Sequence, residues 1–76
     1  MSERKQQIQK ALAREDEEFR TWARQHTEFE QRLAQLADKM TLSAEEEFEE
    51  KELKKRKLWL KDHMAAKIRE YQVSRV

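Results

Sequence analysis

Two histidines are the side chains of this sequence with the widest chemistry near neutral pH, because histidine both titrates there and ligates metal ions. His26 falls among apolar residues in a regular helical pattern. This setting favours a half-buried side chain, hydrogen-bonded across the fold, over a pH sensor or a metal ligand. His63 follows Asp62, and adjacent residues on a helix point about 100° apart, so the two do not form a bidentate metal site. We therefore predict neither a metal site nor a cofactor.

The composition excludes several classes of enzyme and of fold. The 76 residues include no Gly, no Pro and no Cys. Without Cys there is no thiol catalysis, no disulfide and no cysteine zinc site, and without Gly there is no Rossmann or P-loop nucleotide site. No Ser or Lys has a base and an orienting group at an evident spacing. Because turn-rich folds need Gly and Pro, we expect an all-α protein that is not an enzyme and has no small-molecule substrate.

A run of basic residues in the second half of the chain is the candidate surface for binding an anion. It comprises Lys54, Lys55, Lys57 and Lys61, and all but Lys55 lie within about 80° of one another on a helix. Such a stripe suits contacts with the phosphates of a nucleic acid. However, Lys and Arg number 17 against 16 for Asp and Glu, so the net charge is only +1. This balance favours a solvated helix face, with weak nucleic-acid binding as the alternative function.

The elements that position these residues are two long helices. From residue 8 to residue 40, ten positions are separated by alternating steps of four and three, and eight of them are apolar. A repeat of 3.5 residues is the seam of a helix that packs along a partner helix. It predicts one helix over about residues 3–40. The ten positions are Ile8, Leu12, Glu15, Phe19, Trp22, His26, Phe29, Leu33, Leu36 and Met40.

A helix-start signal follows this seam. Ser43 and, three residues later, Glu46 make a capping box, in which each side chain bonds the backbone N–H of the other. This places a turn at about residues 41–43 and a second helix at about residues 44–72. Two long helices joined by so short a connection lie antiparallel as a coiled-coil-like hairpin. One continuous helix through residues 40–45 is the alternative, because no Gly or Pro forbids it.

The apolar positions of the second helix match the seam of the first when the two helices run antiparallel. The second helix carries Leu53, Leu60, Met64, Ile68 and Tyr71, which would meet Leu33, His26, Trp22, Phe19 and Leu12 in that order. Leu36 would lie near Phe48 and close the turn end of the hairpin. This match supports the hairpin independently of the turn.

A second apolar line runs along the second helix, away from the face that meets the first. Phe48, Trp59, Ala66 and Val73 fall near one another on a helical wheel, and Leu58 lies on another side. Two helices do not cover all of these, and a lone two-helix hairpin buries little area. We therefore expect self-association into a helical bundle, or binding to another helical protein. The residues predicted to anchor this contact are Trp22, Phe48, Leu58 and Trp59.

Two segments carry a resemblance, residues 26–36 (HTEFEQRLAQL) and residues 53–62 (LKKRKLWLKD). They resemble the first-helix and second-helix patterns of the YdcH-like family of small bacterial proteins. The resemblance covers about residues 16–70 and implies a helical hairpin in the bacterial cytoplasm, with no established biochemical function. Family members often carry a Pro shortly before the position of Phe19. This chain has Asp16-Glu17-Glu18 there, so we expect its first helix to run unbroken.

The hydropathy pattern bears on the compartment. No apolar run exceeds three residues, whereas a membrane-spanning helix needs about 20. The first six residues contain no apolar stretch of the kind that secretory signals carry. We therefore expect a cytoplasmic protein without a membrane partner. It would act, without catalysis, through protein–protein interaction or self-association.

Overall fold

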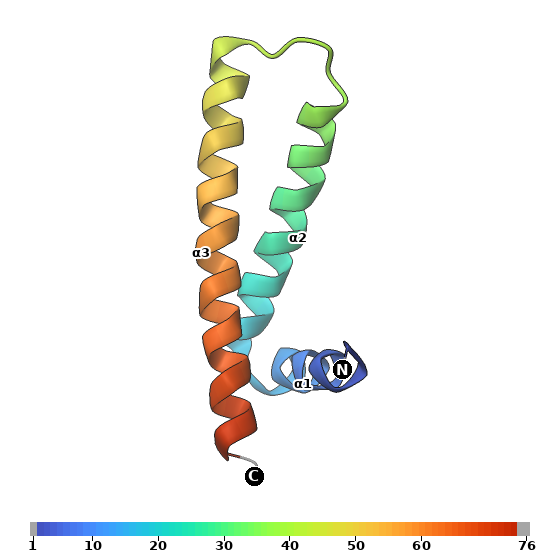
Figure 1. Cartoon of the computed structure of the whole chain (residues 1–76), viewed down its shortest axis with the longest axis vertical. Helices are drawn as coiled ribbons and strands as arrows, with labels where there is room; N and C mark the ends of the chain where they lie inside the picture. Colours follow the sequence, from blue (N-terminus) through green and yellow to red (C-terminus); the bar gives the residue numbers. More distant parts are fainter. Residues whose placement is uncertain (1, 75–76) are drawn as a thin grey trace.

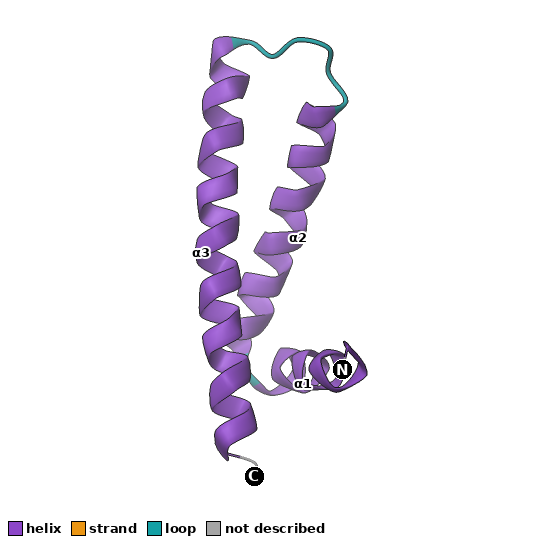
Figure 2. Ribbon diagram, viewed as in Figure 1, coloured by secondary structure: helices purple, strands orange, loops and turns teal. Residues whose placement is uncertain are grey.

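Three α-helices make up the computed structural model, which describes residues 2–74 (Figure 1). α1 spans Ser2–Glu15, α2 spans Glu17–Ala37 and α3 spans Ala44–Ser74, and no strand occurs among the described residues (Figure 2). α2 and α3 lie side by side and antiparallel, and α1 crosses the open end of this pair (Figure 1). The all-α class is therefore confirmed, but the expectation of a hairpin of only two helices was wrong. No helix within this range has the length and apolar character that crossing a membrane requires.

The predicted first helix is divided in two at Asp16. This residue has extended backbone angles, φ −118° and ψ 110°, and its Oδ1 accepts a hydrogen bond from the backbone N–H of Phe19 at 3.0 Å. Asp is among the strongest N-cap residues, because its carboxylate satisfies a donor that a helix start leaves unpaired. Glu17 and Glu18 occupy the first turn of α2, where the helix dipole favours acidic groups. The unbroken helix over residues 3–40 was wrong because this local capping signal interrupts it.

The 3.5-residue repeat continues across the break because both pieces face one core. The buried members of this core are Ile8, Leu12, Phe19 and Ile68, with Met64 and Tyr71 packed against them. Phe19, three residues after the Asp16 cap, is only 1% exposed and lies at the centre of the contact between the three helices. The periodicity therefore identifies buried positions without distinguishing a straight helix from a bent one.

α3 begins at the capping box that the sequence predicts. The backbone N–H of Ser43 donates to Glu46 Oε1 at 3.0 Å, and the backbone N–H of Glu46 donates to Ser43 Oγ at 3.1 Å. α2 ends at Ala37, so the connection covers residues 38–43 and is longer than predicted. Met40, the last position of the seam, consequently lies in the loop and is fully exposed.

The antiparallel pair buries Leu36 of α2 together with Leu53 and Leu60 of α3. Near the turn, Arg32 makes a bidentate bond with Glu49, with Nε 2.8 Å from Oε2 and Nη2 2.9 Å from Oε1. Phe48 does not close this end of the hairpin as expected, since its side chain is 66% exposed. The reason is its position on α3, because it points about 140° away from the buried Leu53 around the helix axis.

Candidate functional site

α3 carries apolar side chains on opposite sides. Leu53, Leu60 and Ile68 are buried, whereas other large apolar side chains of α3 reach solvent. The exposed fractions are 66% for Phe48, 60% for Leu58, 50% for Trp59 and 76% for Val73. We call these four residues the outer face of α3. At about 100° per residue, Phe48, Trp59 and Val73 lie within about 40° of one another, and Leu58 lies at their flank.

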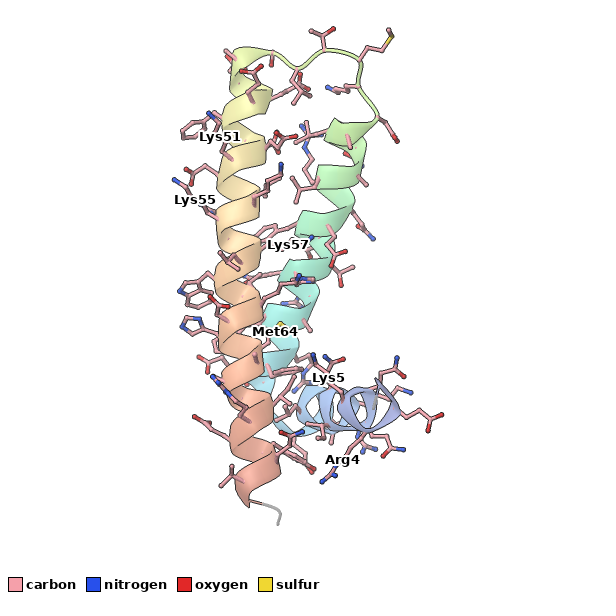
Figure 3. The ribbon with its side chains drawn as sticks, viewed as in Figure 1. Arg4, Lys5, Lys51, Lys55, Lys57 and Met64 are labelled. Atoms are coloured by element: carbon pink, nitrogen blue, oxygen red, sulfur yellow. The ribbon has the colours of Figure 1, made fainter. Side chains whose placement is uncertain are left out.

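Lysines along α3 show which way the outer face points. Lys51 and Lys55 project from the side of α3 that is turned away from α2, whereas Lys57 lies toward α2 (Figure 3). Lys55 is within about 20° of Phe48 around the helix axis. The outer face therefore lies mainly on the side of α3 that is turned away from α2, and its side chains stay at least half exposed.

An aromatic cluster joins the outer face to α2. The ring centroids of Trp22 and Trp59 are 5.7 Å apart, with the rings nearly perpendicular at 87°. His63 stacks on Trp59 with the centroids 3.7 Å apart, and its Nδ1 lies 2.9 Å from the Trp59 carbonyl oxygen. The rings of Trp22 and His63 also meet edge to face, at 5.6 Å. Such contacts contribute about 0.5–1.5 kcal/mol each beyond burial, so the cluster fixes the orientation of the half-exposed Trp59.

The structure brings two of the four predicted anchors together and leaves the other two apart. Trp22 contacts Trp59 across the α2–α3 pair, while Phe48 and Leu58 reach solvent separately along α3. An antiparallel hairpin places His63 nearer to Trp22 than to His26, and the ring contact of His63 with Trp22 confirms this expectation. The stacking of His63 on Trp59 was not predicted. The available signal was its spacing of four residues from Trp59, which makes side chains neighbours on a helix.

Lys67 ties α3 to the break between α1 and α2. Its Nζ donates to Asp16 Oδ2 at 2.7 Å and lies 3.0 Å from Glu18 Oε1. The hydrogen bond with Asp16 holds the pKa of Lys67 above its ordinary value. Bonds from Lys67 and from the Phe19 N–H hold the pKa of Asp16 below its ordinary value. Because Lys67 Nζ is also 5.2 Å from the ring centroid of Trp22, the ion pairs and the aromatic cluster support each other.

The four lysines predicted as an anion site do not share one side of α3. Lys57 is half-buried, whereas Lys54, Lys55 and Lys61 are exposed. Lys55 projects away from α2 while Lys57 lies toward it (Figure 3). Lys54 Nζ is also 3.8 Å from the Glu50 carboxylate, which offsets part of its charge. Lys55 thus lies apart from the stripe of Lys54, Lys57 and Lys61, and Glu50 offsets part of the charge of that stripe.

His26 lies in a groove between the three helices. The groove has a volume of about 690 Å³, and its lining includes Phe19, Met64 and Ile68. His26 Nδ1 is 2.8 Å from Glu30 Oε1, and Nε2 is buried without a hydrogen-bond partner. The expected bond across the hairpin was wrong, because the partner lies one turn along the same helix. Within residues 2–74, no group of three or more His, Asp or Glu side chains is placed to hold a metal ion.

These features define the class as small all-α proteins built on an antiparallel helix pair. The family described as Protein of unknown function (DUF465) matches residues 19–68, which is more than half of the chain. The chain belongs to this family, and the resemblance to YdcH-like proteins is confirmed. The matched range begins at Phe19, so α1 and the break at Asp16 lie outside it. No curated protein and no solved structure matches the chain.

Proposed function

We propose that this protein is a non-enzymatic helical module that binds another protein chain through the outer face of α3. The observation that carries the proposal is the exposure of Phe48, Leu58, Trp59 and Val73 on one helix, at 50% to 76%. Apolar surface in water costs about 25 cal/mol per Å², so large apolar side chains repeated along one exposed side of a helix favour association. Burying these side chains against a partner would therefore stabilise a complex.

The spacing of the outer face suits a helical partner. Phe48, Trp59 and Val73 stay on one side of α3 over about seven turns, so a helix laid along α3 meets all three. Trp59 is held in place by Trp22 and His63 before any partner arrives. An aromatic anchor that is already oriented loses little conformational freedom on binding, which favours affinity.

We also propose that the interaction takes place in the cytoplasm of a bacterium. The support is the resemblance of residues 26–36 and 53–62 to the YdcH-like family pattern. Fractionation of cells that make the protein checks this, since a membrane-bound or secreted pool would contradict it.

Photo-crosslinking in cells that make the protein tests the binding proposal. A benzophenone amino acid replaces Lys55, which lies beside Phe48 on α3, and in a matched variant it replaces Gln31, which is exposed on α2. We expect irradiation to give discrete protein adducts from position 55 and none from position 31. Adding Phe48→Ser and Val73→Ser to the position-55 variant should remove the adducts, because these side chains supply the apolar contact. Equal yields at the two positions, or no adduct at position 55, would contradict the proposal.

A further inference from the structure

Three of the four residues of the outer face, Phe48, Trp59 and Val73, belong to a longer stripe of regular spacing along α3. Successive members of the stripe are separated by four and three residues in alternation, which is the 3.5-residue repeat of a coiled-coil seam. Its members are Phe48, Glu52, Lys55, Trp59, Asp62, Ala66, Arg69 and Val73. The chain thus has two seams on α3, one buried by α1 and α2 and one whose members are half-buried or exposed.

We propose that this outer stripe binds the same stripe of a second copy of the chain, with the two α3 helices antiparallel and Phe48 of each copy opposite Val73 of the other. This inference rests on the proposed function and names its partner. The helices would overlap over about 38 Å. Both ends of the overlap are closed by an apolar pair, Phe48 with Val73, whose side chains are 66% and 76% exposed in the single chain.

Charge complementarity argues for this arrangement. In an antiparallel coiled coil, each seam position of one helix lies opposite one seam position of the other helix. The pairing of Phe48 with Val73 therefore determines all the remaining pairs, which we call layers. The layers are Phe48 with Val73, Glu52 with Arg69, Lys55 with Ala66, and Trp59 with Asp62, each occurring twice. No layer brings like charges together, and Glu52 with Arg69 brings opposite charges together.

A parallel pair is disfavoured by the same stripe. In a parallel dimer each seam position faces its own copy, so Glu52, Lys55, Asp62 and Arg69 would each meet an identical charge. Like charges placed opposite each other at an interface are strongly unfavourable, and here they would occupy half of the eight layers.

Other antiparallel registers are also disfavoured. With Phe48 opposite Ala66, Glu52 faces Asp62, and Val73 lies beyond the start of the other α3. With Phe48 opposite Trp59, Asp62 faces Glu45 and Val73 again has no partner. With Val73 opposite Lys55, Phe48 lies beyond the end of the other α3 at Ser74.

The flanks of the stripe are compatible with the same register. Leu58, which is 60% exposed, would lie beside the exposed Ala65 of the second copy. On the other flank Glu49 would approach Glu70 of the second copy. The bidentate bond with Arg32 already directs the Glu49 carboxylate toward α2, which limits this repulsion.

Reciprocal charge reversal in the full chain tests the inference. Sedimentation equilibrium would measure the dissociation constant for the wild type, Glu52→Arg, Arg69→Glu and the double variant. We expect each single variant to weaken the dimer by about tenfold or more, because it puts like charges together in two layers. The double variant should regain wild-type affinity within about threefold, since opposite charges face each other again. Glu28→Arg, an exposed position on α2 with the same change of net charge, is the control and should leave affinity unchanged.

The outcomes separate this inference from the proposed function. Rescue by the double variant supports the antiparallel register. A dimer that is weakened by the single variants but not rescued, or that none of the variants affects, overturns the register and leaves the proposed function intact. A wild type that stays monomeric at all concentrations overturns self-pairing, and crosslinking at position 55 then decides whether another protein binds.

Discussion

Replacing Asp16 with Ala should destabilise the protein by about 1–2 kcal/mol, because Asp16 has two separate roles. Its Oδ1 caps α2 by accepting the Phe19 N–H at 3.0 Å, and loss of an N-cap costs about 0.5–2 kcal/mol. Its Oδ2 accepts from Lys67 at 2.7 Å, and the two side chains are 29% and 21% exposed. A partly exposed pair of this kind adds up to about 1 kcal/mol. At about 4–8 °C per kcal/mol for a domain of this size, a loss of about 1–2 kcal/mol corresponds to a decrease in Tm of roughly 4–16 °C.

Thermal unfolding followed by circular dichroism at one fixed protein concentration measures this effect. Asp16→Asn is the matched control, because it keeps the capping oxygen and removes only the charge opposite Lys67. We expect its Tm to fall between those of the wild type and Asp16→Ala. Asp16→Ala within about 2 °C of the wild type would refute the role of this residue at the break.

The pH dependence of the same comparison follows from the direction of the pKa shift. Lys67 and the Phe19 N–H hold the pKa of Asp16 below its ordinary value, so the charge of Asp16 stabilises the folded state above about pH 4. This contribution is lost as the pH falls through the lowered pKa. The gap in Tm between the wild type and Asp16→Asn should therefore narrow in acid, and a gap that widened would contradict the ion pair with Lys67.

Three further predictions concern the other capping site and the half-buried His26. Ser43→Ala should lower the free energy of unfolding in urea by about 0.5–2 kcal/mol, because it removes one half of the capping box, and an unchanged midpoint would contradict that role. Lys39 and the Ser43 N–H lower the pKa of Glu46 to about 2, so the stabilisation from its charge should be lost between about pH 4 and pH 2. Urea midpoints measured across that range check this, and Glu46→Gln should flatten the dependence. His26→Phe should raise the urea midpoint, because it removes a buried Nε2 that has no partner and whose desolvation costs about 1–3 kcal/mol; a lower midpoint would show that the bond to Glu30 matters more.

The helix boundaries show how far the sequence alone specifies this fold. The start of α3 was predictable because a capping box is a local signal whose two bonds depend only on Ser43 and Glu46. The break at Asp16 carried a comparable signal, an Asp followed by two acids and an apolar residue. We nevertheless predicted an unbroken helix there, because the 3.5-residue repeat of the seam continues through Asp16 from Ile8 to Leu36. Periodicity indicates which side of a helix faces the core, and it does not distinguish a straight helix from a bent one.

The candidate site was predictable in its residues but not in its geometry. Composition and spacing alone indicate that Phe48, Trp59 and Val73 share a side of α3. The exposed fraction of each side chain depends on how α3 is rotated about its own axis relative to α2. Successive residues point about 100° apart, so a shift by one residue changes which side chains face α2. The offset of Phe48 from Leu53 by about 140° follows from the sequence, but the contact of the Trp59 ring with Trp22 depends on this rotation. Only the packed structure determines it.

Sedimentation equilibrium over a wide concentration range tests the central claim, that the outer face of α3 is a surface for association. The wild type would be compared with Phe48→Ser and Val73→Ser, whose side chains are 66% and 76% exposed and so contribute little to the single fold. Met40→Ser is the matched control, because Met40 is an apolar and fully exposed residue in the loop before α3 and not on the outer face. We predict that the wild type and Met40→Ser associate alike and that both α3 variants associate more weakly. A wild type that remains monomeric throughout, or an equal loss of association in Met40→Ser, would contradict the assignment of this face to self-association.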